Sequence, residues 1–296
     1  ITLPVYPKGR QIYPISELPL EGGIYTTISH GKGDVSFSYY STYDRIFNLT
    51  GVNIYGHGSD LSFPYIDILY GYRKTNILGI GGVIILEWFV LRGDIGYFLT
   101  KDLNSNIKRE STNNPVWYDS LHFSYPLKEQ SNYYQTTFQI EAELPFNMNL
   151  IAQYFQHDTI SYSSENLPVD QEISLPNLNI DPEEITPAFF FNPGVGAPLA
   201  TLTNKAAIIM IDRLFMNQEL KFSIMSIMDL ETNLGLNKVL GSLTEFKIEY
   251  NMYRNLLGLF SITKINGSNI HPEGNNYQFN KMESFSHIRF EIKYFF

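Results

Sequence analysis

The sequence contains no cysteine, few charged residues and no long hydrophobic run. The absence of cysteine among its 296 residues excludes disulfides and cysteine-based metal sites. Charged residues make up 17% of the chain, below the roughly 25% that is usual for soluble domains. The lack of any run of about 18 apolar residues argues against a transmembrane helix. The net charge of −9 disfavours a nucleic-acid partner.

Aromatic residues are abundant, at 15% of the chain, with 21 Tyr and 21 Phe against 2 Trp. The length suffices for one large all-β domain or for two small ones. Few charges together with many Tyr and Phe suit a membrane β-barrel, in which half of each strand is polar.

The last stretch of the chain alternates strictly between apolar and ionic side chains, which is typical of a strand with two different faces. A strand with lipid on one side and water on the other would show this pattern. The alternative is an edge strand of a soluble all-β protein. The apolar set is Ile288, Phe290, Ile292, Tyr294 and Phe296, and the polar set is His287, Arg289, Glu291 and Lys293.

The same period of two recurs upstream in pairs of segments, each pair joined by a short turn and separated from the next by a long loop. Short turns on one side and long loops on the other are typical of outer-membrane barrels, and about 9–11 residues suffice to span the bilayer. The predicted pairs are 23–30 with 34–44, 76–87 with 89–101, 133–144 with 148–161, 204–215 with 219–231, and 242–252 with 256–266.

The sequence therefore predicts an all-β fold, an antiparallel transmembrane β-barrel of about 12 strands with short periplasmic turns and long extracellular loops. Residues 65–74 are either a further strand or part of a loop. The predicted organisation is a Pro-rich irregular segment at 1–22, as an extracellular loop or N-terminal extension, and a barrel at 23–296, with long loops at about 45–64, 102–132, 163–203 and 267–282.

The parity of these strands leads to a further expectation. The five pairs and the last strand make eleven, so the first and the last strand run in the same direction, whereas bacterial barrels have even strand numbers. Either residues 65–74 add a strand, or the chain is the C-terminal portion of a larger barrel.

Two resemblances to known proteins support this interpretation. A terminal Phe on an aromatic, alternating last strand resembles the assembly signal of Gram-negative outer-membrane β-barrels, for which Tyr294 and Phe296 are the candidate residues.

The segments 72–79 and 88–98, with Leu-Arg-Gly-Asp-Ile-Gly-Tyr at 91–97, are similar to a proteobacterial barrel family of unknown function. Asp94 and Gly96 stand where that family has Glu and Ala. The resemblance implies a porin-like barrel and carries no catalytic residues.

The candidate site residues are the charged side chains expected to face water inside the barrel. They either form a constriction that selects solutes or pair across strands and rigidify the wall. The predicted lumen-lining residues are Arg92, Asp94, Glu141, Glu143, Glu245, Lys247, Glu249, Arg289, Glu291 and Lys293.

Other sites have weaker support. The six His residues are scattered without metal-ligand spacing, so no metal site, cofactor or enzymatic activity is expected. His157 with Ser161 or Ser163 is a weak candidate for a barrel hydrolase. The acidic group at 181–184 either binds Ca²⁺ or is a solvated loop. The run Phe189-Phe190-Phe191 is expected to plug the lumen, dock a partner or anchor in the interface.

Two functions follow as expectations. The first is a passive channel for small polar solutes in the outer membrane of a Gram-negative bacterium. The second is a structural barrel subunit, a sleeve or anchor, in a larger outer-membrane complex. The expected partners are the lipid bilayer and lipopolysaccharide, the barrel-assembly machinery and other outer-membrane subunits.

Overall fold

The computed structural model describes residues 20–103, 120–165, 191–230, 239–253, 255–271, 274 and 277–295, with the backbone alone at 60–67 and at 120. In these residues the chain is all-β and forms two antiparallel sheets, one of eleven strands and one of three. Most of the Pro-rich segment 1–22 and the acidic group at 181–184 lie outside the described residues, as do Phe189, Phe190 and Phe296.

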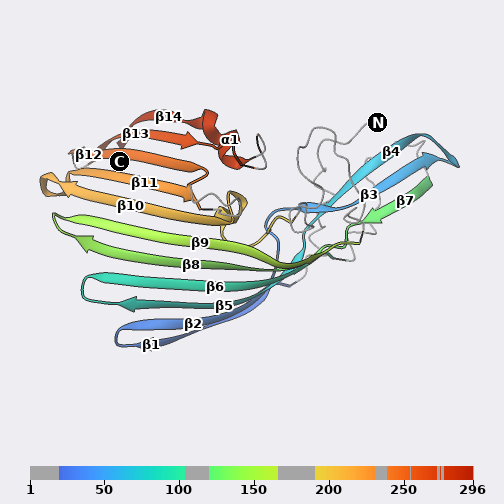
Figure 1. The fold of residues 1–296 in the computed structure, drawn as a ribbon, viewed down its shortest axis with the longest axis horizontal. Coiled ribbons are helices and arrows are strands. Elements are labelled where there is room, and N and C mark those ends of the chain that lie inside the picture. The colour runs from blue at the N-terminus through green and yellow to red at the C-terminus, as the bar shows by residue number, and fades with distance from the viewer. Residues whose placement is uncertain are drawn as a thin grey trace.

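The large sheet contains all five predicted pairs and the last strand, so these predicted strands are confirmed (Figure 1). Its order is β1-β2-β5-β6-β8-β9-β10-β11-β12-β13-β14. The bounds are β1 (Gly22–His30), β2 (Gly33–Tyr43), β5 (Lys74–Ile85), β6 (Phe89–Lys101), β8 (Gln130–Leu144), β9 (Met148–Ser163), β10 (Lys205–Phe215), β11 (Leu220–Asp229), β12 (Ser242–Tyr253), β13 (Leu256–Asn266) and β14 (His287–Tyr294).

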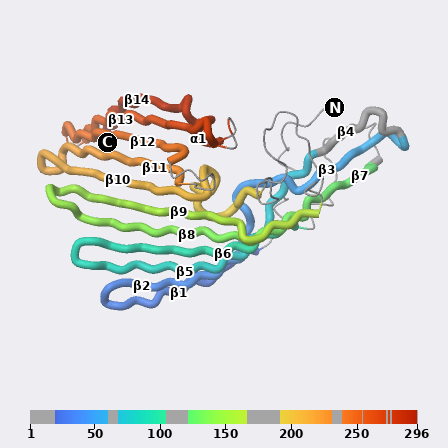
Figure 2. The backbone as a smooth tube through the Cα atoms, in the orientation of Figure 1, coloured from blue at the N-terminus to red at the C-terminus, as the bar shows by residue number. Residues whose placement is uncertain are grey.

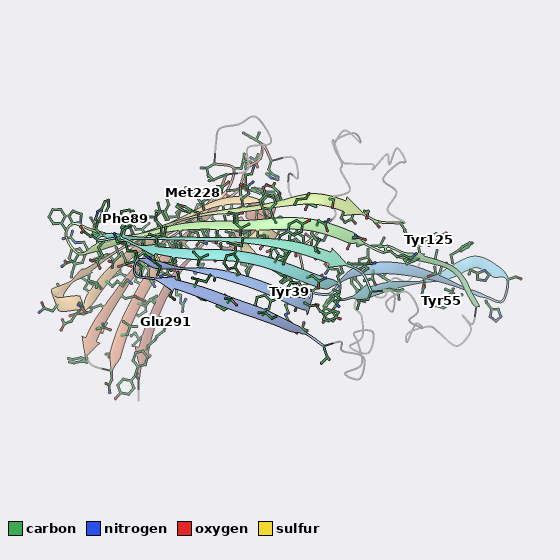
Figure 3. The ribbon with its side chains drawn as sticks, turned by 90° about the horizontal axis from the view of Figure 1, so that it is seen from below. Tyr39, Tyr55, Phe89, Tyr125, Met228 and Glu291 are labelled. Carbon is green, nitrogen blue, oxygen red and sulfur yellow. The ribbon has the colours of Figure 1, made fainter. Side chains whose placement is uncertain are left out.

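The large sheet has two edges. Among the described strands β1 pairs with β2 alone and β14 with β13 alone, so the sheet is open and forms no closed barrel. It is nevertheless curved: seen from below, the strands near the C-terminus lie at a steep angle to β1 and β2 (Figure 3). Tyr39 and Glu291, labelled there, lie toward opposite edges of the sheet.

The small sheet corrects the prediction of irregular loops at 45–64 and 102–132. These ranges contain β3 (Asn48–His57), part of β4 (Asp60–Gly71) and β7 (Ser120–Pro126), in the order β4-β3-β7. The β3–β4 turn includes Gly58 at φ 56°, a conformation that glycine adopts at no steric cost. The described chain thus has fourteen strands where about twelve were predicted, and residues 65–71 belong to β4.

The connections alternate between short and long, as predicted. The short ones lie at one end of the large sheet, here called the short-turn end, and the long ones lie at the opposite, long-loop end (Figure 1). Asn147 and Asn217 occupy two of the short turns with positive φ, which Asn tolerates better than most residues. Strands β3, β4 and β7 extend beyond the long-loop end (Figure 2).

Short helical elements occur in the connections between strands, and the predicted loop at 267–282 contains one of them. No helix in the described parts of the chain is long and apolar enough to cross a membrane. Phe279, on α1, is fully buried in a cluster with Leu240, Ile265 and Tyr277. The elements are η6 (Pro198–Thr201), η7 (Met216–Gln218), α1 (Gln278–Met282) and η9 (Glu283–Phe285).

The strand register divides the large sheet into two faces. Directly paired residues share a face, and one row runs Tyr39, Leu78, Tyr97 and Tyr134 across four strands. The face that contains this row is called the apolar face, and the other is called the polar face. Exposed apolar residues of the apolar face are Ile24, Val35, Phe37, Leu78, Ile80, Ile95, Phe138, Ile211, Ile224, Ile262, Ile288, Phe290 and Ile292.

Candidate functional site

Carboxylate side chains are sorted between the two faces of the large sheet. The basic side chains of its strands are divided equally, with Lys74, Lys101, Lys205, Arg213 and Lys264 on the apolar face. All ten predicted lumen-lining residues lie on the polar face. This follows from the strand register, because directly paired residues share a face and the pairs can be traced from one strand to the next. Across β12, β13 and β14, Glu249 aligns with Glu291, and Lys247 aligns with Arg289. Of the strand carboxylates of this sheet, Asp158 alone lies on the apolar face. The polar face carries Asp34, Asp94, Glu141, Glu143, Asp212, Asp229, Glu245, Glu249 and Glu291 against Arg92, Lys221, Lys247, Arg289 and Lys293.

Many charges on the polar face form ion pairs between half-exposed side chains. Arg92 Nε donates to Glu141 Oε1 at 2.9 Å across β6 and β8, so its partner is Glu141 and not its near neighbour Asp94. On β14, Arg289 Nη2 lies 2.7 Å from Glu291 Oε2, and Lys293 Nζ lies 3.4 Å from the same oxygen. Exposed pairs of this kind contribute about 0–1 kcal/mol each to the free energy of unfolding.

A second group of charges is buried at the long-loop end and was not predicted. We define the buried ion cluster as Asp44, Arg73, Asp102 and Glu129. The Arg73 side chain is 1% exposed, and its Nε donates to Asp44 Oδ2 at 2.6 Å. Its Nη1 donates to Glu129 Oε2 at 2.8 Å, and its Nη2 donates to the Asn192 carbonyl. Every nitrogen of this guanidinium therefore has a partner, which a buried charge requires.

Hydroxyl groups complete the cluster from the ends of four strands. Thr42, Thr75, Thr100 and Ser131 form one buried row on the polar face. Thr75 Oγ1 donates to Asp44 Oδ1 at 3.0 Å and lies 2.8 Å from Thr100 Oγ1. The outer members of the row bond elsewhere, because Thr42 Oγ1 donates to Glu21 Oε1 at 2.7 Å and Ser131 Oγ donates to the Ser161 carbonyl at 3.2 Å.

Asp102 is the acid of the cluster whose pKa is shifted most. Its side chain is 6% exposed, and its Oδ2 accepts a hydrogen bond from the Glu129 amide at 2.8 Å. Burial raises the pKa of Asp102 to about 7, although the amide opposes the shift, and the Glu129 carboxylate raises the pKa further. Burial also raises the pKa of Asp44, against the opposing charge of Arg73.

The cluster holds a segment of chain across the polar face. We define the inner segment as residues 191–197. Phe191 is 6% exposed, packs on Tyr133 and Tyr162, and lies 4.8 Å from the Arg73 guanidinium. Tyr133 Oη donates to the Val195 carbonyl at 2.9 Å.

Two glycines bring the inner segment close to the wall. The Arg45 amide donates to the Gly194 carbonyl at 3.0 Å, and a Cβ at Gly194 would lie 2.1 Å from Asp44 Cγ. Gly196 has φ 122°, and a Cβ there would lie 2.2 Å from the Gln135 side chain. The close approach of the inner segment therefore requires glycine at both positions.

A second buried polar group lies near α1, also on the polar face. Asp229 is 0% exposed and accepts hydrogen bonds from Thr203 Oγ1 at 2.6 Å and from the Tyr277 hydroxyl. Tyr277 and Phe279 pack against Gly241, where a Cβ would lie 2.4 Å from Tyr277 Oη. Asp229 thus fastens the connections before β10 and before β14 to the end of β11.

The structure separates the residues of the weaker candidate sites. His157 lies on the polar face beside Tyr133, whereas Ser161 and Ser163 pair with Asn132 and Gln130 on the apolar face, so the register does not bring this weak candidate pair together. In the described residues no group of His, Asp and Glu is arranged to hold a metal ion. Tyr294 lies on the apolar face in register with Leu256.

Comparisons of the chain with protein-family models, curated proteins and solved structures find no match.

Proposed function

We propose that the large sheet is the wall of an outer-membrane channel through which small polar solutes diffuse passively. The apolar face contacts lipid and the polar face contacts water. The observation that carries the proposal is the sorting of carboxylates: nine of the ten strand carboxylates share one face, and most of the exposed Ile and Phe residues of the large sheet lie on the other.

The energetics of the bilayer account for this sorting. A charged side chain on the lipid face costs roughly 2–4 kcal/mol at the bilayer midplane, whereas a large apolar patch in contact with water favours association. On the apolar face, Ile80 is 56% exposed, Ile95 is 54% exposed and Ile224 is 50% exposed. A soluble protein would cover such a face, and lipid covers it here.

The covered part of the polar face supports a narrowed passage. The inner segment and α1 both lie over this face at the long-loop end. Arg73 and Tyr133 hold the inner segment, and the buried carboxylate of Asp229 holds Tyr277 at the start of α1. Solutes would then pass a constriction at this end before they meet the charged rows of β6, β8, β12 and β14. Selection rests on pore radius and electrostatics, with no covalent chemistry.

The orientation follows from the connections. In outer-membrane barrels the short turns face the periplasm and the long loops face outward. We therefore place the short-turn end in the periplasm, with β14 as the strand read by the barrel-assembly machinery. The proposed surroundings are the bilayer and lipopolysaccharide of a Gram-negative outer membrane.

The open edges favour a second candidate, a structural barrel subunit of a larger outer-membrane complex. Eleven antiparallel strands leave β1 and β14 running in the same direction, so their direct pairing would be parallel. Lipid cannot satisfy the backbone groups of an edge strand. An odd number of additional strands between β14 and β1 would close the sheet with antiparallel pairs throughout.

Electrical recording from planar bilayers tests the channel. The protein is extracted in detergent and inserted into phospholipid bilayers, and insertion is verified separately by flotation with liposomes. Discrete conductance steps that heat-denatured protein does not produce are expected. Inserted protein without conductance would reject the channel, and co-purification with a partner at fixed stoichiometry would then support the structural subunit.

A further inference from the structure

The apolar face changes character where it reaches the long-loop end. Four strands carry a lysine on this face near that end: Lys74 on β5, Lys101 on β6, Lys205 on β10 and Lys264 on β13. Asp158 is the one carboxylate on this face of the described strands, and it accepts a hydrogen bond from Tyr134 Oη at 2.6 Å. A chain of net charge −9 thus presents a basic border just beyond its apolar surface.

Lys74 and Lys101 form the densest part of this border. They are directly opposite each other in the β5–β6 ladder, where like charges are destabilising. Within the described part of the chain neither amine forms an ion pair, whereas Lys128, Lys221, Lys247 and Lys293 each do. The opposed pair therefore suits an anion from outside the chain.

A cavity of about 470 Å³ lies at this position. Beside the two lysines it is lined by Asn76, Gln130 and Asn132, which carry side-chain amides, and by Leu99, Thr100 and Leu103. Ammonium and amide groups are the hydrogen-bond donors that phosphate oxygens accept. Asp102 also borders the cavity, but its Oδ2 is bound to the Glu129 amide in the buried ion cluster.

Apolar side chains continue from the cavity toward the short-turn end along the same two strands. Leu99 is 37% exposed, Leu78 is 51% exposed, and Ile80 and Ile95 form the next apolar pair of the β5–β6 ladder. The hydrogen-bond donors of the cavity are thus followed, along the strands, by exposed apolar surface. A ligand with a phosphate head group and acyl chains would match both parts. A free phosphate ion would use only the first part.

We propose that Lys74 and Lys101 bind the phosphate head group of a phosphorylated membrane lipid whose acyl chains lie along Leu99, Leu78 and Ile80. The inference rests on the proposed membrane location of the large sheet. Basic residues just outside a hydrophobic span are attracted to anionic lipid head groups, and this attraction weakens with salt. The expected ligand is therefore a phosphate-bearing lipid in the leaflet at the long-loop end.

Native mass spectrometry of the protein in zwitterionic detergent tests the site. The probes are diphosphoryl lipid A, the same lipid after enzymatic removal of its phosphates, and inorganic phosphate. The expected result is one tightly retained diphosphoryl lipid A, at least tenfold weaker retention of the dephosphorylated lipid, and no displacement by inorganic phosphate at equal concentration. Displacement by inorganic phosphate would overturn the lipid as the ligand.

The variant Lys74→Gln/Lys101→Gln is expected to weaken retention of lipid A at least tenfold. The matched control Lys221→Gln/Lys247→Gln removes the same charge from the polar face and should leave retention unchanged. Equal effects of both double variants would overturn the site. Far-UV circular dichroism verifies that both variants fold.

Liposome flotation with protease protection separates this inference from the proposed function. If the protein inserts but the Lys74/Lys101 variant binds lipid A like the parent, the lipid site alone is rejected. If the parent protein neither floats with liposomes nor gains protection, the membrane location fails and the lipid site fails with it.

Discussion

Two groups of ion pairs in the same sheet differ sharply in burial. The Arg73 and Asp44 side chains are 1% and 0% exposed, whereas those of Arg92 and Glu141 are 52% and 33% exposed. Removing one partner of a buried pair leaves an unpaired charge and costs roughly 3–5 kcal/mol, whereas an exposed pair contributes about 0–1 kcal/mol. Loss of one partner is therefore expected to be far more costly in the buried ion cluster than among the charges of the polar face.

Substitution of Arg73 tests the larger of the two stability costs, the one expected in the buried ion cluster. Arg73→Met is expected to lower the free energy of unfolding by about 3–5 kcal/mol, because Asp44 and Glu129 lose their buried counter-charge. Urea unfolding in detergent micelles measures this change. Arg92→Met removes the same group from the exposed pair and should cost about 1 kcal/mol or less. Similar losses for both variants would contradict the distinction.

The pH dependence of stability tests the protonation of the cluster. The pKa of Asp102 is about 7 in the folded state and about 3.9 in an unfolded chain, so the folded protein retains a proton between these values. The free energy of unfolding therefore falls as the pH rises from about 4 to about 7, by up to about 4 kcal/mol. Asp102→Asn should flatten this part of the urea-derived profile, and Asp94→Asn should leave it in place. An unchanged profile in Asp102→Asn would assign the slope to other groups.

The smallest effect on stability is expected on the polar face, where the effect on conduction is expected to be large. Glu249→Gln should change the free energy of unfolding by less than about 1 kcal/mol, because Glu249 pairs with Lys247 in a partly exposed position. It should also lower the preference for cations, because carboxylates outnumber basic residues on this face. Reversal potentials in a salt gradient measure this preference. Asp158→Asn, on the apolar face, is the control, and an equal shift there would contradict the assignment of the faces.

The eleven strands of the large sheet could be predicted from the sequence because several carry a period of two and the short turns join the others to them, as β10 with its almost continuous apolar run from Ala206 to Ile211 is joined to β11. In β12 the alternation of Phe246 and Ile248 with Glu245 and Lys247 specifies both the strand and its faces. The turns at Asn147 and Asn217 are local features as well. The positions of the ten charged candidates on one face followed from the same period of two.

The small sheet and the buried ion cluster could not be predicted in this way. Gly51, Gly56 and Pro64 indicate a loop, and the pairing of β3 with β7 depends on residues far apart in the chain. Arg73 donates hydrogen bonds to residues 29, 56 and 119 positions away, and a local sequence pattern cannot predict such contacts. Asp102 and Glu129 fall within 102–132, a range whose many Asn, Ser and charged residues predict a loop.

The span of sequence gathered around Arg73 has a consequence for the order of folding. The cluster joins the ends of β2 and β6 and the starts of β5 and β8 to Asn192, so it can form only after those strands are in register. Contacts that close such long stretches of chain form slowly, because the entropy of closure is lost before the contact is made. We therefore expect the strands of the wall to pair before the bond between Arg73 and the Asn192 carbonyl, 119 residues apart, fixes the inner segment across them.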